Sequence, residues 1–435
     1  MKKVPVVAVA DRAEEAARLA GLSLEATVAL AEVAGAVKDG LLAFASATGL
    51  VVMAQMMEAE LTERIGPKHA KIAGRSASRH GSTTGSVVLG GRKVSVRRPR
   101  GRTTEGEEIG LDTWAVFSAE DLLRRLVVER MLAGVATRRH EAVAEPVGTE
   151  LEKAAKATSK SAVSRRFVKA TERALFELNA RDLSSLEVAV VMVDGVELAG
   201  QCCVVCLVIT ADGTKVPVGL WLGSTENATV VTNLLADLQA RGLRSAEGVL
   251  VVIDGSKALA AGVRRVFGED AEVQRCTLHK RRNVSDHLPK ELQKSIDRRL
   301  AAAFAHAEWR TGLDRAKALA RELKADHPDA AASLLEGLED MFTVRRLGTT
   351  GTLAKSLTTT NAIESMISIT RTTARNVKRW RDGEMKKRWV AAGMLEAERS
   401  FRRIMGHRDL PKLLAVLRAR RAKGDTAEGY AETAA

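Results

Sequence analysis

The sequence predicts an α/β domain with a helical insertion, preceded by mostly helical regions and a small basic β-hairpin. Between residues 186 and 287 the pattern runs strand, strand, strand, helix, strand, helix, strand, helix, which is typical of a mixed α/β layer. From residue 290 to 342 the sequence becomes Ala-rich, predicting at least three helices with Pro328 as a break. The length of 435 residues adds an expectation of about two to three domains.

The first part of the chain combines a helical pattern with a basic hairpin. Residues 1–66 place Leu, Val and Met at helical spacing, which favours a unit for helix packing or oligomerisation. Residues 71–102 carry nine basic and no acidic side chains, and their glycines predict the turn of a hairpin. Arg97 and Arg98 on its cationic edge are candidates for phosphate contact, and a solvated or flexible basic arm is the alternative.

Several helices are expected to follow the hairpin. Ser118 is a candidate N-cap, with Asp121 three residues later, where a capping box carries an acid or amide. A second helix is expected to run to Glu145, where the next residue, a proline, stops it. A third is expected to begin near Ser159 or Ser161.

This third helix carries a basic face. Arg165, Lys169 and Arg173 recur at four-residue steps, and Arg166 lies beside them. A helix, a turn and a basic second helix suit the major groove of DNA, so the region is predicted to be helix-turn-helix-like. Cationic amphipathic helices without this role are the alternative, because two glutamates partly balance the charge.

Composition favours a nucleic-acid partner and disfavours a membrane protein. The chain has 68 Lys and Arg against 54 Asp and Glu, a formal net charge of +14 that attracts polyanions. Aromatic residues make up only 3%, which argues against base-stacking platforms and favours double-stranded DNA. The N-terminal apolar stretch is too short for a signal peptide, and no run is expected to approach a membrane span.

The cysteines are expected to be reduced. Cys202, Cys203 and Cys206 lie in one strand-like run and are predicted to be small core residues. A zinc site at Cys203 and Cys206 would need a second pair of ligands, for which Cys276 and His279 are the nearest candidates. Free thiols suit the cytoplasm, which is the expected location.

Three acidic residues are candidate metal ligands. Asp194 and Asp254 each close an apolar strand-like run and precede a glycine, and Glu364 opens a basic helix. Two carboxylates at strand ends, with a third approaching from a helix, form a site that suits Mg²⁺, which prefers oxygen ligands. An ordinary strand-ending turn is the alternative for each Asp-Gly pair. The following hairpin, with Asp212 at its turn, supports the metal site.

Two further features accompany the acidic residues. Arg371, Arg375 and Lys378 follow Glu364 at spacings that would share one helix face, giving a carboxylate beside a cationic rail suited to a DNA backbone. Cys276 and His279 lie three residues apart before a basic triplet. By residue chemistry alone, His279 is a metal ligand, a phosphate contact or a structural histidine.

Together these motifs resemble the DDE transposases of bacterial insertion sequences of the Mutator type, over nearly the whole chain. The resemblance implies a ribonuclease-H-like catalytic domain interrupted by an all-helical insertion. It also implies Mg²⁺ dependence, with two ions and Mn²⁺ as a substitute, and binding to the terminal inverted repeats of the element. Asp194, Asp254 and Glu364 would ligate the metal, and Cys276 and His279 would support the active site.

The implied reaction is hydrolysis at a transposon end, followed by attack of the freed 3′-hydroxyl on another phosphodiester. A structure-specific nuclease and a domesticated non-catalytic DNA-binding protein are the alternatives. The lone Tyr430, in an apparently disordered tail, makes a tyrosine recombinase implausible. Joining two element ends and target DNA implies a homodimer or a higher oligomer. The expected parts are 1–66 (helical), 67–117 (basic hairpin), 118–183 (helical, DNA-binding), 184–288 (catalytic, first part), 289–345 (helical insertion), 346–408 (catalytic, second part) and 409–435 (tail).

Overall fold

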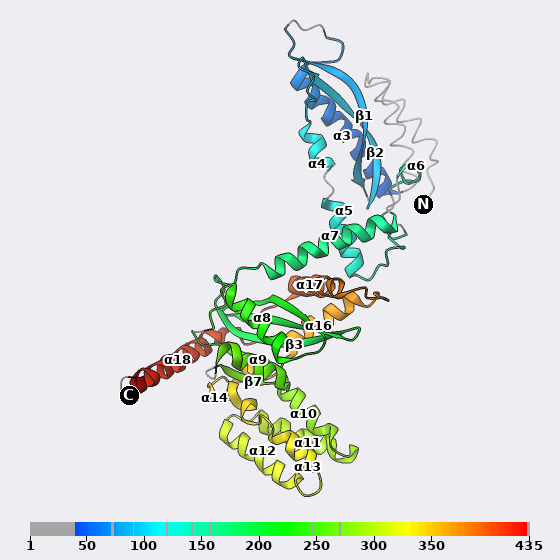
Figure 1. Ribbon diagram of the computed structural model, residues 1–435. Helices are drawn as coiled ribbons and strands as arrows, with labels where there is room; N and C mark the ends of the chain where they lie inside the picture. Colours follow the sequence, from blue (N-terminus) through cyan, green and yellow to red (C-terminus); the bar gives the residue numbers. More distant parts are fainter. Residues whose placement is uncertain are drawn as a thin grey trace, which may run out of the picture. The chain divides into compact units, whose positions relative to one another are not determined.

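The computed structural model describes residues 40–70, 74–89, 91–118, 121–140, 142–145, 147–155, 159–245, 247–268 and 271–432 (Figure 1). The chain divides into two compact units, Met1–Ala170 and Thr171–Ala435. The expected division into seven parts stays a prediction, and most of its first part lies outside the described residues.

The first unit is built on a helix packed against a two-stranded hairpin. Its elements are α3 (Leu41–Ile65), β1 (Ala77–Leu89) and β2 (Arg92–Thr103), and the two strands pair antiparallel as predicted. Met53, Met57 and Leu61 recur at four-residue spacing and bury one face of α3 against the hairpin. Gly101 allows the close approach, since a Cβ there would lie 2.9 Å from Leu61 Cδ1.

Helix α3 corrects one expectation from the sequence. By length and composition alone it could cross a membrane, so the statement that no run approaches a membrane span is wrong for this helix. A helix packed into the core of a folded domain can meet the same criteria of length and composition. α3 shares a hydrophobic core with β1 and β2. The membrane interpretation therefore rests on composition only.

The helices after the hairpin differ from the prediction. They are α4 (Asp112–Phe117), α5 (Asp121–Leu132) and α6 (Thr149–Ala154). Ser118 is the C-cap of α4, so its assignment as the N-cap of the next helix is wrong. The helix expected to reach Glu145 is also wrong, because the chain turns after Leu132. Gly134 has a φ of +93°, and Val135 N–H donates to Arg130 O at 2.8 Å, which closes α5 in a Schellman motif.

Helix α7 (Lys160–Asn179) begins where the sequence predicts. The Ser159 hydroxyl oxygen accepts from the Ala162 N–H at 3.3 Å, which is N-cap geometry. Arg165 and Lys169 are exposed, and Arg173 is held by Glu177 at 2.6 Å. The helix-turn-helix arrangement itself stays a prediction.

The second unit contains a five-stranded mixed sheet in the order β5-β4-β3-β6-β7. β3, β4 and β5 form an antiparallel meander, whereas β6 and β7 run parallel to β3, as the predicted element order requires. Gly213, with a φ of +88°, lies in the expected turn between β4 and β5. The strands are β3 (Val188–Leu198), β4 (Gln201–Thr210), β5 (Lys215–Gly223), β6 (Leu250–Ile253) and β7 (Glu272–Arg275).

Helices cover both faces of this sheet (Figure 1). Alternate residues of β3 separate the two cores: Val191 and Val193 pack with α8 (Ala228–Ala240) and α9 (Lys257–Phe267), whereas Val190 and Met192 face the other helices. Cys202, Cys203 and Cys206 are free and buried in these cores, which confirms their prediction as core residues. The helices on the second face are α15 (Gly351–Leu357), α16 (Asn361–Ala374), α17 (Gly383–Ser400) and α18 (Leu410–Glu432).

A separate helical block lies between β7 and α15 and has its own hydrophobic core (Figure 1). Pro328 occupies the first turn of a helix there, so it starts an element as well as breaking the pattern. Trp309 is partly buried and packs against this core. The elements are α10 (Thr277–Asp286), α11 (Lys290–Phe304), α12 (Trp309–Leu323), α13 (Pro328–Leu335), η2 (Glu339–Phe342) and α14 (Thr343–Arg346).

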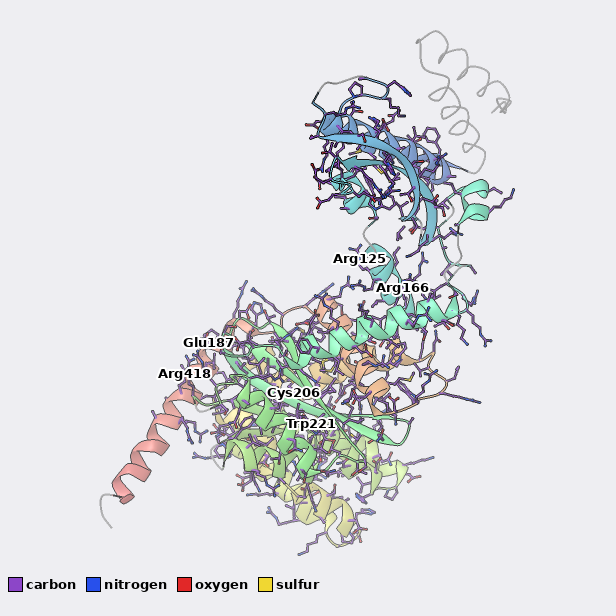
Figure 2. The ribbon with its side chains drawn as sticks, turned by 45° about the horizontal axis from the view of Figure 1, so that its top comes forward. Arg125, Arg166, Glu187, Cys206, Trp221 and Arg418 are labelled. Carbon is purple, nitrogen blue, oxygen red and sulfur yellow. The ribbon has the colours of Figure 1, made fainter. Side chains whose placement is uncertain are left out.

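The C-terminal segment is not the disordered tail that the sequence suggested. Residues 410–432 form α18, and Leu410, Leu413, Leu414 and Leu417 are buried in the core of the sheet. Arg418 pairs with Glu187 at 2.9 Å and with Glu247 at 3.1 Å, which fixes the helix beside the sheet (Figure 2). These leucines recur at helical spacing in the sequence, but the charged residues between them obscure the apolar pattern.

Candidate active site

The sheet brings Asp194 and Asp254 to one place. β3 and β6 pair in parallel from Val190 and Leu250 to Met192 and Val252, and extending this register by two residues puts Asp194 beside Asp254. Asp254 follows the last residue of β6, as predicted. The expectation that Asp194 ends its strand is wrong, because β3 continues past it along β4. Asp194 instead marks the point where the parallel partner stops.

Backbone amides hold both aspartates. The Gly195 N–H donates to Asp194 Oδ1 at 2.7 Å, and the Ser256 N–H donates to Asp254 Oδ1 at 2.7 Å. Ser256 is also the N-cap of α9, where its hydroxyl oxygen accepts from the Leu259 N–H at 3.3 Å. The second aspartate therefore lies in the turn that connects β6 to a capped helix.

A fourth acidic residue, Glu226, lies against these aspartates and was missed in the sequence. It precedes Asn227, the N-cap of α8, and it accepts a hydrogen bond from the Ser256 hydroxyl. Burial raises the pKa of Asp194 to about 7, and the charges of Asp254 and Glu226 add to this rise. Burial also raises the pKa of Glu226. The group is thus a partly buried concentration of negative charge.

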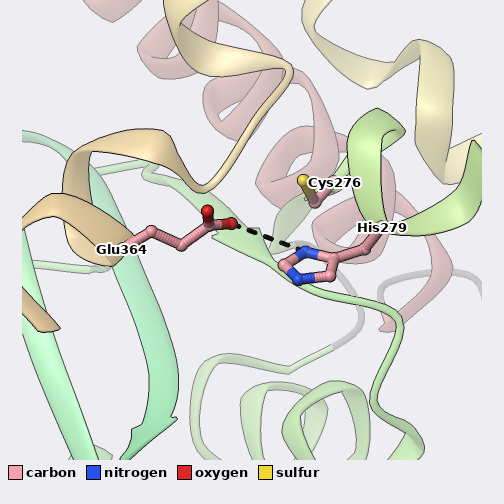
Figure 3. A group of neighbouring side chains, drawn as sticks. All are labelled: Cys276, His279 and Glu364. Atoms are coloured by element: carbon pink, nitrogen blue, oxygen red, sulfur yellow. Dashed lines mark ion pairs between the residues drawn. The ribbon is translucent and has the colours of Figure 1, made fainter. Parts of the chain in front are cut away.

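Glu364 lies close to two other predicted site residues, Cys276 and His279, although they are far from it in the sequence. It lies in the first turn of α16, which packs against β3, and its Oε1 atom lies 3.7 Å from His279 Nδ1 (Figure 3). Cys276 is the N-cap of α10, and its N–H donates to Ile253 O at 2.8 Å, directly before Asp254. One ligand atom from each of Cys276, His279 and Glu364 lies within 4.8 Å of the others, close enough to hold one ion.

Thr360 connects these three side chains and was also missed. Its hydroxyl donates to Glu364 Oε1 at 2.5 Å and lies 3.4 Å from His279 Nδ1, while its N–H donates to Cys276 Sγ at 3.4 Å. It is completely buried at the N-cap of α16, yet its hydroxyl makes no capping bond. The side chain therefore orients Glu364 instead of capping its helix.

Hydrogen bonding couples the ionisation of Cys276 and His279. The hydrogen bond with Cys276 raises the pKa of His279 to about 9, with burial opposing and the Glu364 and Asp254 charges adding to the rise. Burial acts to raise the pKa of the Cys276 thiol, but its hydrogen bonds to His279 and Thr360 hold that pKa below the usual value. His279 is therefore cationic at neutral pH beside the Glu364 carboxylate.

The predicted cationic rail after Glu364 is wrong in its second half. α16 ends at Ala374, so Arg371 lies in its last turn, Arg375 is its C-cap and Lys378 lies beyond the helix. The chain leaves the helical path because Trp380 packs back onto the core of the sheet. All three cations are exposed, but they do not share one helix face.

The candidate DNA contacts on the hairpin differ in their freedom. Arg98 Nη2 lies 2.7 Å from Glu108 Oε1, and its guanidinium lies 5.4 Å from the centroid of the Trp114 ring. Arg97 donates to the Ser82 hydroxyl oxygen at 2.7 Å. Arg166 on α7 is only partly exposed (Figure 2). Arg97 is therefore better placed than Arg98 to exchange its partner for a phosphate.

Comparison with known proteins identifies the class to which this protein belongs. Residues 22–403 match the family model described as "Transposase, Mutator family", so the protein is a transposase, a DNA-processing enzyme. The chain belongs to the Mutator family of transposases. This confirms the family resemblance seen in the sequence, although the match does not assign a role to any single residue.

Individual relatives are transposases of insertion sequence elements. The chain is 27% identical over 330 residues to the transposase for insertion sequence element IS256 in transposon Tn4001 from Staphylococcus aureus, covering 72% of this chain and 80% of the relative. It is 29% identical over 251 residues to the transposase for insertion sequence element ISRM5 from Rhizobium meliloti (strain 1021), covering 55% and 59%. It is also 29% identical over 170 residues to the transposase for insertion sequence element IST2 from Acidithiobacillus ferrooxidans, covering 39% and 56%.

Proposed function

We propose that this transposase cleaves and joins DNA strands at the terminal inverted repeats of its insertion sequence, with a ribonuclease-H-like catalytic domain and a DDE site. The observation that carries the proposal is the parallel register of β3 and β6, which puts Asp194 beside Asp254. The packing of α16 against β3 adds Glu364 to the same domain. The mixed five-stranded sheet with helices on both faces is consistent with this type of domain.

The residues fit a divalent cation. Asp194, Asp254 and Glu364 offer hard oxygen ligands, the donors that Mg²⁺ prefers, and Mn²⁺ accepts the same set. The pKa of Asp194 is raised because burying its charge beside neighbouring carboxylates is energetically unfavourable. A bound cation would offset this unfavourable energy. When bound, two such ions would activate the attacking oxygen and stabilise the leaving oxygen of the phosphodiester.

The remaining side chains have supporting roles in this proposal. His279 as an imidazolium balances the charge of Glu364, and Thr360 fixes the position of one oxygen of that carboxylate. Cys276 holds the His279 side chain through their hydrogen bond. A sulfur and a nitrogen donor suit zinc better than magnesium, so we assign Cys276 and His279 to orientation instead of Mg²⁺ coordination.

The partners follow from the proposed reaction. Exposed Arg165 and Lys169, with Arg166 beside them, are the proposed contacts of α7 with duplex DNA, and Arg97 is that of the hairpin. Arg371, Arg375 and Lys378 are proposed to contact phosphates near Glu364, as separate cations. Bringing two element ends together with target DNA requires at least a homodimer, acting in the cytoplasm.

The test is Mg²⁺-dependent cleavage of a labelled duplex that carries the end of the element, with strand transfer into a second duplex. Wild-type protein is expected to nick the element end, whereas Asp194→Asn, Asp254→Asn and Glu364→Gln should bind the duplex and leave it intact. Glu384→Gln is the matched control, because Glu384 is exposed in the first turn of α17 and pairs with Lys387 at 2.5 Å. Cleavage by any of the three site variants at the wild-type rate would contradict the DDE assignment.

A further inference from the structure

The turn between β5 and α8 brings Glu226 against the segments that follow both aspartates. On one side, the Ser256 hydroxyl donates to Glu226 Oε1, while the Ser256 N–H donates to Asp254 Oδ1 at 2.7 Å. On the other side, Glu226 Oε2 approaches the backbone at Gly195 so closely that a Cβ on this residue would lie 2.7 Å from it. One carboxylate thus touches the residue after Asp194 and the residue that holds Asp254.

Helix capping does not explain the position of the Glu226 side chain. The Asn227 side chain already caps α8 by accepting from the Val230 N–H at 3.1 Å. Ser256 caps α9 through its hydroxyl oxygen, which leaves its hydroxyl hydrogen for Glu226. The charges that act on Glu226 include those of Asp254 and Glu197, both acidic. Like charges held together in a partly buried place are unfavourable without a cation.

We propose that Glu226 is a fourth carboxylate of the divalent-cation site, where Ser256 holds it beside Asp194 and Asp254. Its charge increases the affinity of the site for the cation, and its contacts with Gly195 and Ser256 keep the two aspartates in place. The inference rests on the proposed function, because it takes Asp194 and Asp254 as metal ligands. It adds a residue that lies outside the three-carboxylate set.

The role of Glu226 explains why position 195 is glycine. A side chain at this position would meet Glu226 Oε2 at 2.7 Å and Cys202 Sγ at 3.0 Å. Neither neighbour can retreat easily, because Cys202 is buried in the core and Glu226 is held by Ser256. The glycine therefore allows the carboxylate to lie directly against the strand that carries Asp194.

The experiment measures Mn²⁺ binding to the full-length protein in the absence of DNA, by electron paramagnetic resonance of the free ion, so that no catalytic step enters the result. Glu226→Gln keeps an acceptor for Ser256 and removes only the charge, and it is expected to weaken Mn²⁺ binding about tenfold. Ser256→Ala should weaken binding less, because the charge remains but is no longer held. Glu384→Gln is the matched control, because Glu384 is an exposed carboxylate on α17 whose removal should change the affinity less than about twofold.

The outcomes separate this inference from the proposed function. If Asp254→Asn abolishes Mn²⁺ binding and Glu226→Gln binds Mn²⁺ as the wild type does, the role of Glu226 is wrong and the metal site stands. If wild-type protein binds no Mn²⁺, or if Asp254→Asn and Glu226→Gln both bind it normally, the metal site and the inference are both overturned. Equal losses of Mn²⁺ affinity in Glu226→Gln and Glu384→Gln would show only an effect of general surface charge and would overturn the inference alone.

Discussion

The Nδ1 atom of His279 lies 3.7 Å from Oε1 of Glu364, so a cation from α10 faces the carboxylate of α16 (Figure 3). The helical block from α11 to α14 separates these two helices in the sequence. The contact therefore depends on the chain returning to the sheet after the whole insertion. Thr360 completes it, because its hydroxyl reaches both side chains.

Thr360→Val is expected to lower the rate of DNA cleavage about tenfold or more, since Glu364 loses a hydrogen bond that orients it. Binding of the duplex should be unchanged, and Thr360→Ser should restore the rate. Single-turnover cleavage and a binding titration measure the two quantities. Thr359→Val is the control, because the neighbouring Thr359 hydroxyl is buried without a hydrogen-bond partner. Equal effects of the two valine substitutions would contradict a specific role for Thr360.

Asp194→Asn is expected to stabilise the metal-free protein, increasingly as pH rises from 5 to about 7. A carboxyl group whose folded-state pKa is raised to about 7 loses folding free energy as pH rises from its ordinary value of 3.8 towards 7, and asparagine has no such loss. Thermal unfolding in the presence of a chelator measures the difference.

Asp212→Asn should show the opposite sign. Hydrogen bonds from Thr210 and Thr214 lower the pKa of Asp212 to about 2, so its carboxylate stabilises the protein above its ordinary pKa, and that contribution is lost as pH falls towards 2. The variant should therefore be less stable than the wild type between pH 5 and 8. For the preceding prediction, the contradicting outcome is a difference in stability between wild type and Asp194→Asn that stays constant from pH 5 to about 7. Such a constant difference would contradict the burial of Asp194 as a charged group.

Lys280→Met is expected to lower the unfolding temperature by roughly 5 to 10 °C. The side chain is 2% exposed, and its Nζ donates to Ser333 O at 2.6 Å, Glu336 O at 2.7 Å and Glu336 Oε2 at 3.0 Å. These bonds join α10 to the end of α13, so their loss should loosen the insertion. Calorimetry measures the shift, and Arg282→Met, at an exposed position of the same helix, should change it little.

Arg97→Ala is expected to weaken duplex binding and to reduce the slope of log affinity against log salt by about one. Arg98→Ala should have a smaller effect on binding, because Arg98 is engaged with Glu108 and Trp114. Fluorescence anisotropy at several salt concentrations measures both variants. The adjacent positions make a matched pair, and a larger salt effect from Arg98→Ala would show that its protein contacts open on DNA.

The sequence was sufficient for the parts of the site that depend on local pattern. Asp194 and Asp254 were found because an apolar run followed by Asp-Gly marks the region where a strand pairing ends, and Ser159 because a cap precedes its helix. Glu226 and Thr360 were missed, since each gains its role from a contact with a distant segment: Ser256 for Glu226, and Cys276 and His279 for Thr360. A loop glutamate and a cap threonine have many ordinary explanations.

Helix ends were the other source of error, and the reasons are physical. Lys378 fits the spacing of α16, but Trp380 draws the chain onto the core after Ala374. Ser118 resembles an N-cap in composition, yet it ends α4. The last segment looked disordered from its charges, although its leucines at helical spacing bury α18 against the sheet. For Lys378 and for the last segment, tertiary packing overrode the local pattern.

The placement of the three carboxylates also bears on the order in which parts of the chain fold. β6 must pair beside β3, and α16 must dock on β3 after the chain has passed through the helical block, and both steps join segments far apart in sequence. Such long-range contacts form slowly compared with local helices and hairpins. The basic hairpin and α7 are local structures that can form earlier. Under the proposed function, a newly made chain would therefore acquire affinity for DNA before its cleavage site was complete.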